Sequence, residues 1–215
     1  MTEMHHLDRQ ASTESKFHWL FLNGEKPSAE LYDTIIDETA NFAVLPTKGS
    51  IVPGWVLIVP KFPVSRIADV PETLSVELST LVRRVVEKVQ AEFGKTFAFE
   101  HGGYKGSKIS CGVDQAHLHV VPLPFDLVDA AETASPGSWN SFGSTLIPNG
   151  DMPDDEYWFV SDGNLSKYKA LSEPSSQFFR KVIACGVGSK DSWDYRQADF
   201  IENVKVTLKT VGANG

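Results

Sequence analysis

The chain has 215 residues, enough for one good-sized domain or for one domain with a substantial extension. Hydrophobic residues make up 41% of it and charged residues 22%, as is typical of a globular protein. The net charge of −8 disfavours general binding to nucleic acid, because an acidic surface repels a phosphate backbone. A local pocket can still hold a small anion.

The cysteines and the N-terminal segment point away from export and membranes. The two cysteines, Cys111 and Cys185, fit neither a disulfide framework nor a metal-binding spacing, so a cytoplasmic location is predicted. The N-terminus is polar and no run approaches the length of a membrane span, which argues against a signal peptide or a membrane protein. Residues 1–16 are expected to form a flexible tail.

The first half of the chain predicts strands around one long helix. Residues 32–36 and 42–46 are short apolar runs that are typical of a β-hairpin. A nearly continuous apolar strand is predicted at 54–60 and another at 96–102. Between these two, apolar residues recur at steps of three and four over 71–94, which predicts an amphipathic helix.

A glycine-rich loop, GGYKGSKISCG, separates this part from a strand at 115–123, QAHLHVVPL. Composition and apolar spacing then predict a long loop at 125–155 and a hairpin at 157–171 that turns at Asp162-Gly163. Two helices are predicted after it, one over 175–186 capped by Ser175 or Ser176, and one over about 202–209.

The strand at 115–123 has a polar face. Side chains alternate along a strand, so Gln115, His117 and His119 share one face while the apolar residues between them point to the core. Two neighbouring imidazoles can bind a transition metal, or one can attack an electrophile while the other moves a proton. They can also be buried and hydrogen-bonded, and the motif alone leaves these three uses open.

The order of these elements resembles the histidine triad (HIT) family. QAHLHVV fits the family's alternation of histidines and apolar residues except at its first position, where Gln115 replaces histidine, and PGWVLIVPK is similar to the family's Pro-Gly-His strand. The resemblance covers roughly residues 30–125. It implies an α+β fold, with an antiparallel sheet of about five strands and the long helix on the face opposite the histidines.

The same resemblance divides the chain into three parts. Residues 1–16 would be the tail, 17–125 a HIT-like domain, and 126–215 a C-terminal α/β extension packed on it, as in a branch of the family with a long extension. The resemblance also implies a homodimer, unless the extension covers the surface that a second copy would use.

HIT enzymes are nucleotide hydrolases and transferases, so the resemblance implies chemistry at a phosphorus atom. His117 would attack an α-phosphate and form a covalent nucleotidyl-histidine, while His119 would contact the phosphate and help to protonate the leaving group. The Gln115 amide can keep an orienting role but carries no titrating proton. The expected ligand is a small nucleotide or phosphate ester with a phosphoanhydride or phosphoramidate bond. No cofactor is expected, although a divalent metal can accompany the substrate.

Seven further residues are candidates for binding that substrate. They are Ser107, Ser110, His101, Glu100, Thr47, Trp55 and Arg180. The two serines lie in the glycine-rich loop, and Glu100 and His101 end the strand before it. Trp55 and Thr47 stand where many family members have a histidine and a ribose-binding aspartate. Each has a structural alternative, such as a loop serine, a core tryptophan or a solvated arginine.

Two other functions fit the same residues. A metal-dependent enzyme would use His117 and His119 as ligands together with His101, but the glutamate that follows such a pair in cupin sites is missing, and no metal site is predicted. A catalytically weakened HIT-fold protein would bind a nucleotide without turning it over, which the replacements at Gln115 and Thr47 favour.

Overall fold

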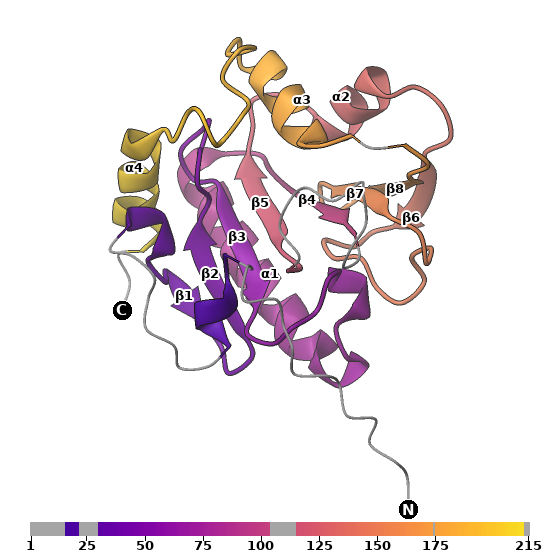
Figure 1. The fold of residues 1–215 in the computed structure, drawn as a ribbon, viewed down its shortest axis with the longest axis horizontal. Coiled ribbons are helices and arrows are strands. Elements are labelled where there is room, and N and C mark those ends of the chain that lie inside the picture. The colour runs from indigo at the N-terminus through magenta and orange to yellow at the C-terminus, as the bar shows by residue number, and fades with distance from the viewer. Residues whose placement is uncertain (1–15, 22–29, 104–114, 174, 213–215) are drawn as a thin grey trace, which may run out of the picture.

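The computed structural model describes residues 16–21, 30–103, 115–173 and 175–212, and it is organised around one antiparallel sheet (Figure 1). Within these ranges, eight strands lie in the order β1-β2-β3-β5-β4-β7-β8-β6. Their bounds are β1 Asp37–Glu38, β2 Phe42–Pro46, β3 Val56–Pro60, β4 Thr96–Gly102, β5 Leu118–Pro122, β6 Asn140–Gly143, β7 Tyr157–Ser161 and β8 Ser166–Ala170.

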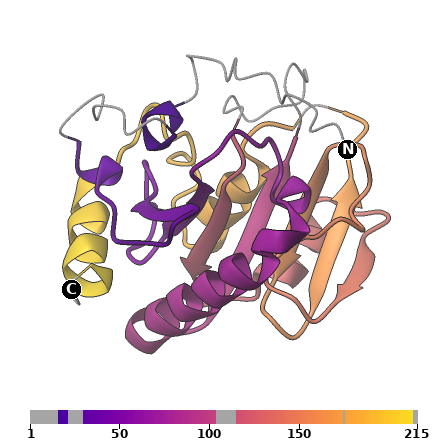
Figure 2. The ribbon, with the colours of Figure 1, turned by 90° about the horizontal axis from the view of Figure 1, so that it is seen from below.

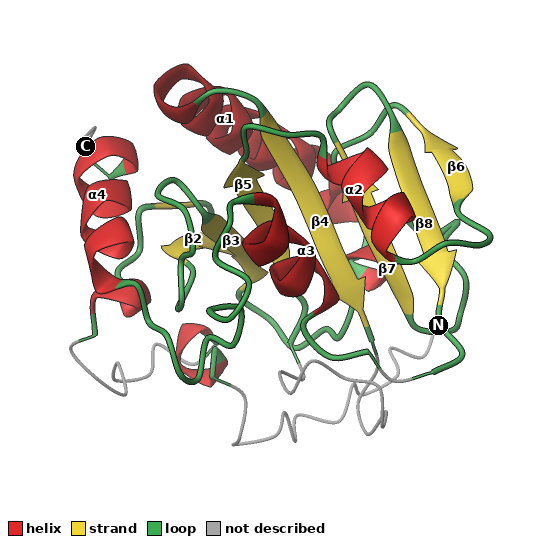
Figure 3. Ribbon diagram, turned by 90° about the horizontal axis from the view of Figure 1, so that it is seen from above, coloured by secondary structure: helices red, strands yellow, loops and turns green. Residues whose placement is uncertain are grey.

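In the described part of the chain, four α-helices cover the two faces and one end of this sheet. Their bounds are α1 Ser75–Phe93, α2 Leu127–Ala134, α3 Phe178–Gly186 and α4 Ile201–Val211. Short 3-10 turns occupy His18–Leu20, Leu31–Asp33, Ile67–Asp69 and Glu72–Leu74. Helix α1 crosses one face, as Figure 2 shows, whereas α2 and α3 lie over the opposite face in Figure 3. None of the described helices is both long and apolar enough to cross a membrane.

The sheet is continuous across the predicted domain boundary. Strands β1 to β5 belong to the part before residue 125, which confirms the expected antiparallel sheet of about five strands with a long helix. The extension adds the other three, because β7 pairs with β4 from Ala98↔Ser161 to Gly102↔Tyr157. The β4 edge of the HIT-like part is therefore occupied by a strand of the same chain.

The alternation of side chains along β5 separates two cores. Leu118 and Val120 pack with the buried face of α1, which the apolar spacing over 71–94 predicts. Val121 and Leu123 pack with α2 and α3 on the other side. Full burial of each such side chain contributes about 1.5–3 kcal/mol to folding, so both helical layers are integral to the fold.

Several predicted elements are shifted or were missed. The first strand of the N-terminal hairpin is Asp37–Glu38, and residues 31–33 form a 3-10 turn instead. The interval 125–155 is not one long loop, because Asp126 caps α2 by accepting hydrogen bonds from two backbone N–H groups, and β6 follows. Helix α3 begins at Phe178, after Gln177 in a left-handed conformation, without the predicted serine cap.

Helix α4, predicted at about 202–209, fastens the loop that leads into β3. Thr207 Oγ1 accepts a hydrogen bond of 2.8 Å from the Gly54 N–H. The Asn203 amide donates to the carbonyls of Ser50 and Ile51 at 2.7 and 3.0 Å. Gly54 has φ +83°, and a Cβ there would lie 2.6 Å from the Phe93 ring, so glycine is required at this corner. The end of the chain thereby fixes the start of β3.

Candidate active site

The two histidines of QAHLHVV lie at the start of the central strand. His119 is in β5, opposite Leu57 of β3 and Phe99 of β4. His117 directly precedes the strand, which begins at Leu118 and not at the predicted residue 115. The two rings are 5.0 Å apart between centroids and inclined by 67°. Both belong to the face opposite α1, as expected from the alternation.

A backbone carbonyl sets the tautomer of His117. Its Nδ1 lies 2.8 Å from the carbonyl oxygen of Gln115, and a carbonyl can only accept, so Nδ1 carries the proton. The lone pair of the neutral ring is then on Nε2. The ring is half-buried and also approaches Phe17, at 5.9 Å between centroids. This is the protonation state that a nucleophilic imidazole needs.

An indole N–H sets the opposite tautomer in His119. Trp55 Nε1 donates to His119 Nδ1 at 3.0 Å, so the proton of the neutral His119 ring is on Nε2. Phe99 stacks on the ring, at 4.4 Å and 7°. Burial lowers the pKa of His119 well below its ordinary value, and the charges of His117 and Arg180 lower it further. A cationic His119 that could protonate a leaving group therefore does not fit this environment.

Gln115 connects the motif to the end of β3. Its amide nitrogen donates to the carbonyls of Pro60 and Phe62 at 3.2 and 2.9 Å, and its amide oxygen accepts from the Val64 N–H at 3.4 Å. The side chain is buried, and these contacts use its polar atoms. Gln115 orients His117 through its backbone carbonyl rather than through its amide.

Trp55 and Arg180 join the extension to the histidine face. Trp55 is fully buried, and the Arg180 guanidinium lies over its ring at 4.9 Å. Arg180 is buried too and donates to the carbonyls of Trp193, at 2.8 Å, and Gly49. Burial lowers its pKa to about 10, which leaves it cationic at neutral pH. Arg180 is thus neither a solvated helix residue nor in the position of a solvent-facing phosphate ligand.

His101 is the third imidazole of this face. Continuation of the β4–β5 register beyond Phe99↔His119 places it opposite His117. Its Nε2 lies 3.9 Å from a carboxylate oxygen of Glu156, which would favour a charged ring. Burial outweighs this contact and lowers the pKa of His101 to about 4, so the ring is neutral at pH 7.

Glu100 points to the other face and is bound internally. Its carboxylate accepts one hydrogen bond of 2.7 Å from the Ile67 N–H and another of 2.6 Å from the Tyr157 hydroxyl. Only 1% of the residue is exposed. Burial raises the pKa of Glu100 to about 7, although the Tyr157 hydrogen bond opposes this change. This position gives Glu100 a structural role in place of the predicted substrate contact.

Glu100→Gln is expected to remove a pH-dependent loss of stability. A carboxyl group with a folded-state pKa of about 7 binds protons more tightly than in the unfolded chain, where 4.5 is ordinary, so stability falls as the pH rises between these values. The neutral amide does not titrate and can still bond to Ile67 and Tyr157. Relative to the original chain, the variant should gain up to about 3 kcal/mol of unfolding free energy from pH 4.5 to 7.5. Urea unfolding at several pH values measures this, and a constant difference would contradict it.

The remaining predicted residues separate into buried and undescribed ones. Thr47 is 4% exposed and its hydroxyl donates to the Lys48 carbonyl at 3.4 Å, so it too is internal. Ser107 and Ser110, with the whole segment 104–114, lie outside the described residues. Within the described ranges, no group of three or more His, Cys, Asp or Glu side chains has an arrangement that could hold a metal ion.

Sequence reasoning missed the aromatic residues that pack around His119 and the tyrosine that binds Glu100 on the other face of the sheet. Phe99 stacks on His119 and packs against Phe179, with the Phe99 and Phe179 ring centroids 4.5 Å apart. Tyr157 donates a hydrogen bond to Glu100. The alternation Phe97, Phe99, His101 in the predicted strand at 96–102 contained the signal for Phe99. Tyr157 and Phe179 come from the extension, and their contacts depend on a strand pairing that no local pattern reveals.

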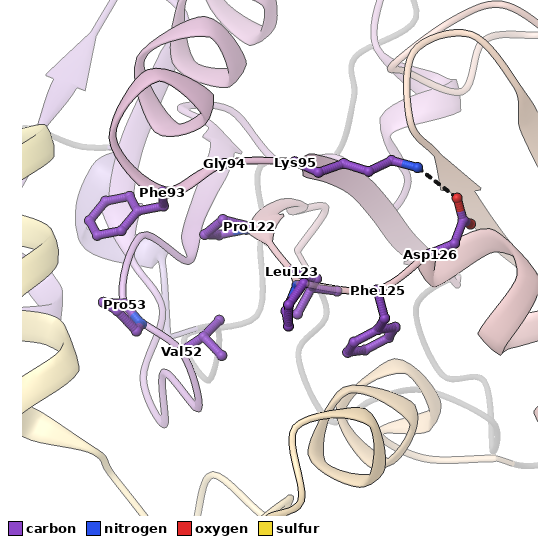
Figure 4. A pocket seen from close by; sticks show the side chains of 10 residues that line it. Val52, Pro53, Phe93, Gly94, Lys95, Pro122, Leu123, Phe125 and Asp126 are labelled. Carbon is purple, nitrogen blue, oxygen red and sulfur yellow. Dashed lines mark hydrogen bonds and ion pairs between the residues drawn. The ribbon is translucent and has the colours of Figure 1, made fainter.

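A separate apolar groove lies at the far end of β5. Its volume is about 510 Å³, and Val52, Pro53, Phe93, Gly94, Lys95, Pro122, Leu123, Pro124, Phe125 and Asp126 line it. Figure 4 shows the Lys95 side chain pointing toward Asp126. Lys95 Nζ donates a hydrogen bond of 2.7 Å to the Asp126 carboxylate. Because β5 runs from Leu118 to Pro122, this groove is at the end away from His117.

Comparisons with known proteins give one family match and several similar solved structures. Residues 28–125 match the HIT domain family. Similar solved structures include a Hit-like protein involved in cell-cycle regulation from Bartonella henselae, at 16% identity over 41% of this chain and 68% of that one with a TM-score of 0.36. A HIT family protein from Bacillus anthracis gives 17% identity, 51% and 73% coverage, and a TM-score of 0.41.

A third structure, a hypothetical histidine triad nucleotide-binding protein from Sulfolobus tokodaii, covers 83% of this chain and 88% of its own. Its identity is 13% and its TM-score 0.34. None of the curated proteins compared with the chain matches it. With the antiparallel sheet, the long helix and the paired histidines in place, the match over residues 28–125 identifies that part of the chain as a HIT domain.

Proposed function

We propose that this protein is a HIT-type nucleotide hydrolase or nucleotidyl transferase that acts at an α-phosphate through a covalent nucleotidyl-histidine at His117. The supporting observation is the 2.8 Å hydrogen bond between His117 Nδ1 and the Gln115 carbonyl, which places the lone pair on Nε2. In this tautomer the neutral ring can attack an electrophile through Nε2.

The reaction would proceed in two displacements. The Nε2 lone pair attacks the α-phosphorus, a P–N bond forms, and the bond from phosphorus to the leaving group breaks with its electron pair on that group. Water or another acceptor then attacks the same phosphorus and loses a proton to solvent. The P–N bond breaks with its electron pair on Nε2, which returns His117 to its neutral form. His119 Nε2–H serves as a hydrogen-bond donor to a non-bridging phosphate oxygen, where negative charge increases in the transition state.

A second candidate is a HIT-fold protein that binds a nucleotide and does not turn it over. The specific observation in its favour is that the Gln115 amide is bound to the backbone at Pro60, Phe62 and Val64. A side chain held in this way cannot transfer a proton in place of the family's first histidine. Tight nucleotide binding without any product would identify this function.

Hydrolysis in water labelled with oxygen-18 distinguishes the two. A panel of dinucleoside polyphosphates, nucleoside phosphoramidates and nucleotide esters is incubated with the full chain, and the products are analysed by mass spectrometry. Attack at the α-phosphorus places the label in the nucleoside monophosphate, whereas attack elsewhere places it in the leaving group. Turnover with the label only in the leaving group would exclude the proposed site of attack.

Three further expectations stay proposals. Homodimerisation would need a surface other than the β4 edge, because β7 of the same chain already pairs there. A cytoplasmic location and a small nucleotide or phosphate ester as the ligand belong to the same proposal.

A further inference from the structure

We propose that Trp55 is a positioning residue which holds His119 as a neutral Nε2–H donor and so restricts the enzyme to phosphoanhydride substrates. The leaving group of an anhydride departs as an oxyanion and needs no proton. The nitrogen of a phosphoramidate must gain a proton before it leaves as an amine. This inference rests on the proposed function and narrows its substrate class.

The geometry around His119 Nδ1 leaves no place for a proton on this atom. An indole N–H can only donate, so the 3.0 Å contact from Trp55 Nε1 requires a lone pair on Nδ1. An imidazolium ring has protons on both nitrogens and would place two N–H groups against each other. The His119 ring also cannot turn away, because Phe99 stacks on it at 4.4 Å and Trp55 packs against it at 5.7 Å.

The positive charge of Arg180 lies over the Trp55 indole and also opposes protonation of His119. The Arg180 guanidinium lies 4.9 Å from the Trp55 ring centroid, in a position held by its bonds to the carbonyls of Trp193 and Gly49. A cation over an indole strengthens the N–H as a donor and also repels a second positive charge nearby. His117 and His101, the other titratable groups that act on His119, oppose its protonation as well.

None of the three described imidazoles on this face is placed to protonate a leaving group. His119 could release only the proton on Nε2, which would form an imidazolate and is unfavourable near pH 7. His117 directs its own proton to the Gln115 carbonyl, and the half-buried His101 is neutral. The three imidazoles described on this face therefore supply hydrogen bonds but no acid. General acid catalysis typically contributes about 100-fold or more, so a substrate that depends on it should react slowly.

The test compares two substrates that share one nucleoside 5′-phosphoryl group, one an anhydride and one a phosphoramidate. The original chain should turn over the anhydride at least about 100-fold faster. Trp55→Phe keeps an aromatic ring but removes the donor, so Nδ1 can accept a proton, and the rate ratio should fall at least about tenfold. Trp139→Phe is the matched control, because it removes an indole N–H bond of the same 3.0 Å length, to the Ser135 carbonyl, and should leave the ratio unchanged.

Nitrogen-15 NMR of the original chain tests the positioning without activity or substitution. His119 should show the neutral tautomer with its proton on Nε2 from pH 5 to 8. An imidazolium signal at pH 6, equal rates on the two substrates, or the same ratio in Trp55→Phe would overturn the inference. If neither substrate reacts and His117 forms no adduct, the proposed function fails instead, and the NMR result still decides whether Trp55 fixes His119.

Discussion

His117→Gln is expected to reduce turnover of the preferred nucleotide by about 1,000-fold or more, because an amide nitrogen has no lone pair for attack on phosphorus. Glutamine is similar in size and can keep a hydrogen bond to the Gln115 carbonyl, so folding and substrate binding should change little. Steady-state kcat and the nucleotide Kd, measured on the same preparations, separate the loss of chemistry from a loss of affinity.

The matched control for this variant is His101→Gln, which removes an imidazole from the same face of the sheet. Because the proposed mechanism gives this ring no part in the attack, we expect kcat to fall at most about tenfold. Equal losses in both variants would mean that the histidine face as a whole had been disturbed. Unchanged turnover in His117→Gln would remove His117 from the mechanism.

Deletion of residues 126–215 is expected to destroy cooperative folding and to cause aggregation. The extension covers Trp55, Phe97 and Phe99 with α2 and α3, and its strand β7 pairs with β4. Without it, the chain would expose this apolar face together with an unpaired strand edge, and both promote aggregation. Thermal unfolding and size-exclusion chromatography of the shortened chain measure the effect.

Single substitutions on α3 test the contribution of the extension to stability one side chain at a time. Phe179→Ala should lower the free energy of unfolding by about 3–5 kcal/mol, because this buried ring packs against Phe99 at 4.5 Å. Cys185→Ser, at an exposed position of the same helix, should change it by less than about 0.5 kcal/mol. A soluble and fully active deletion variant would show that the extension is not needed for the site.

The sequence predicted what local periodicity controls. The apolar spacing over 71–94, the continuous run at 54–60 and the alternation around His117 indicated α1, β3 and the histidine face, since each depends on residues close in the chain. The predictions failed where contacts between residues distant in the chain decide the secondary structure. Ile35 and Ile36 form no strand although they are apolar, and the polar pair Asp37–Glu38 forms β1 because β2 supplies the hydrogen-bonding partner.

The sequence predicted the histidine motif of the site but not the residues that surround it in the folded chain. His117 and His119 could be identified from residue type and spacing, but their opposite tautomers depend on a carbonyl at Gln115 and an indole at Trp55 that only the folded chain brings close. Glu100, Thr47 and Arg180 looked available in sequence and are buried in the structure. Burial of a polar side chain follows from tertiary contacts, such as those of Arg180 with Trp193 and Gly49.

Mass spectrometry of the intact protein during turnover tests the covalent step most directly. The full chain is mixed with its nucleotide substrate and quenched within the first turnover in alkaline denaturant, because a P–N bond to histidine is labile in acid. The mass should increase by one nucleotidyl group, fragmentation should place that group on His117, and His117→Gln should show no increase. Rapid turnover with no adduct, or the same adduct in His117→Gln, would contradict nucleophilic attack by this residue.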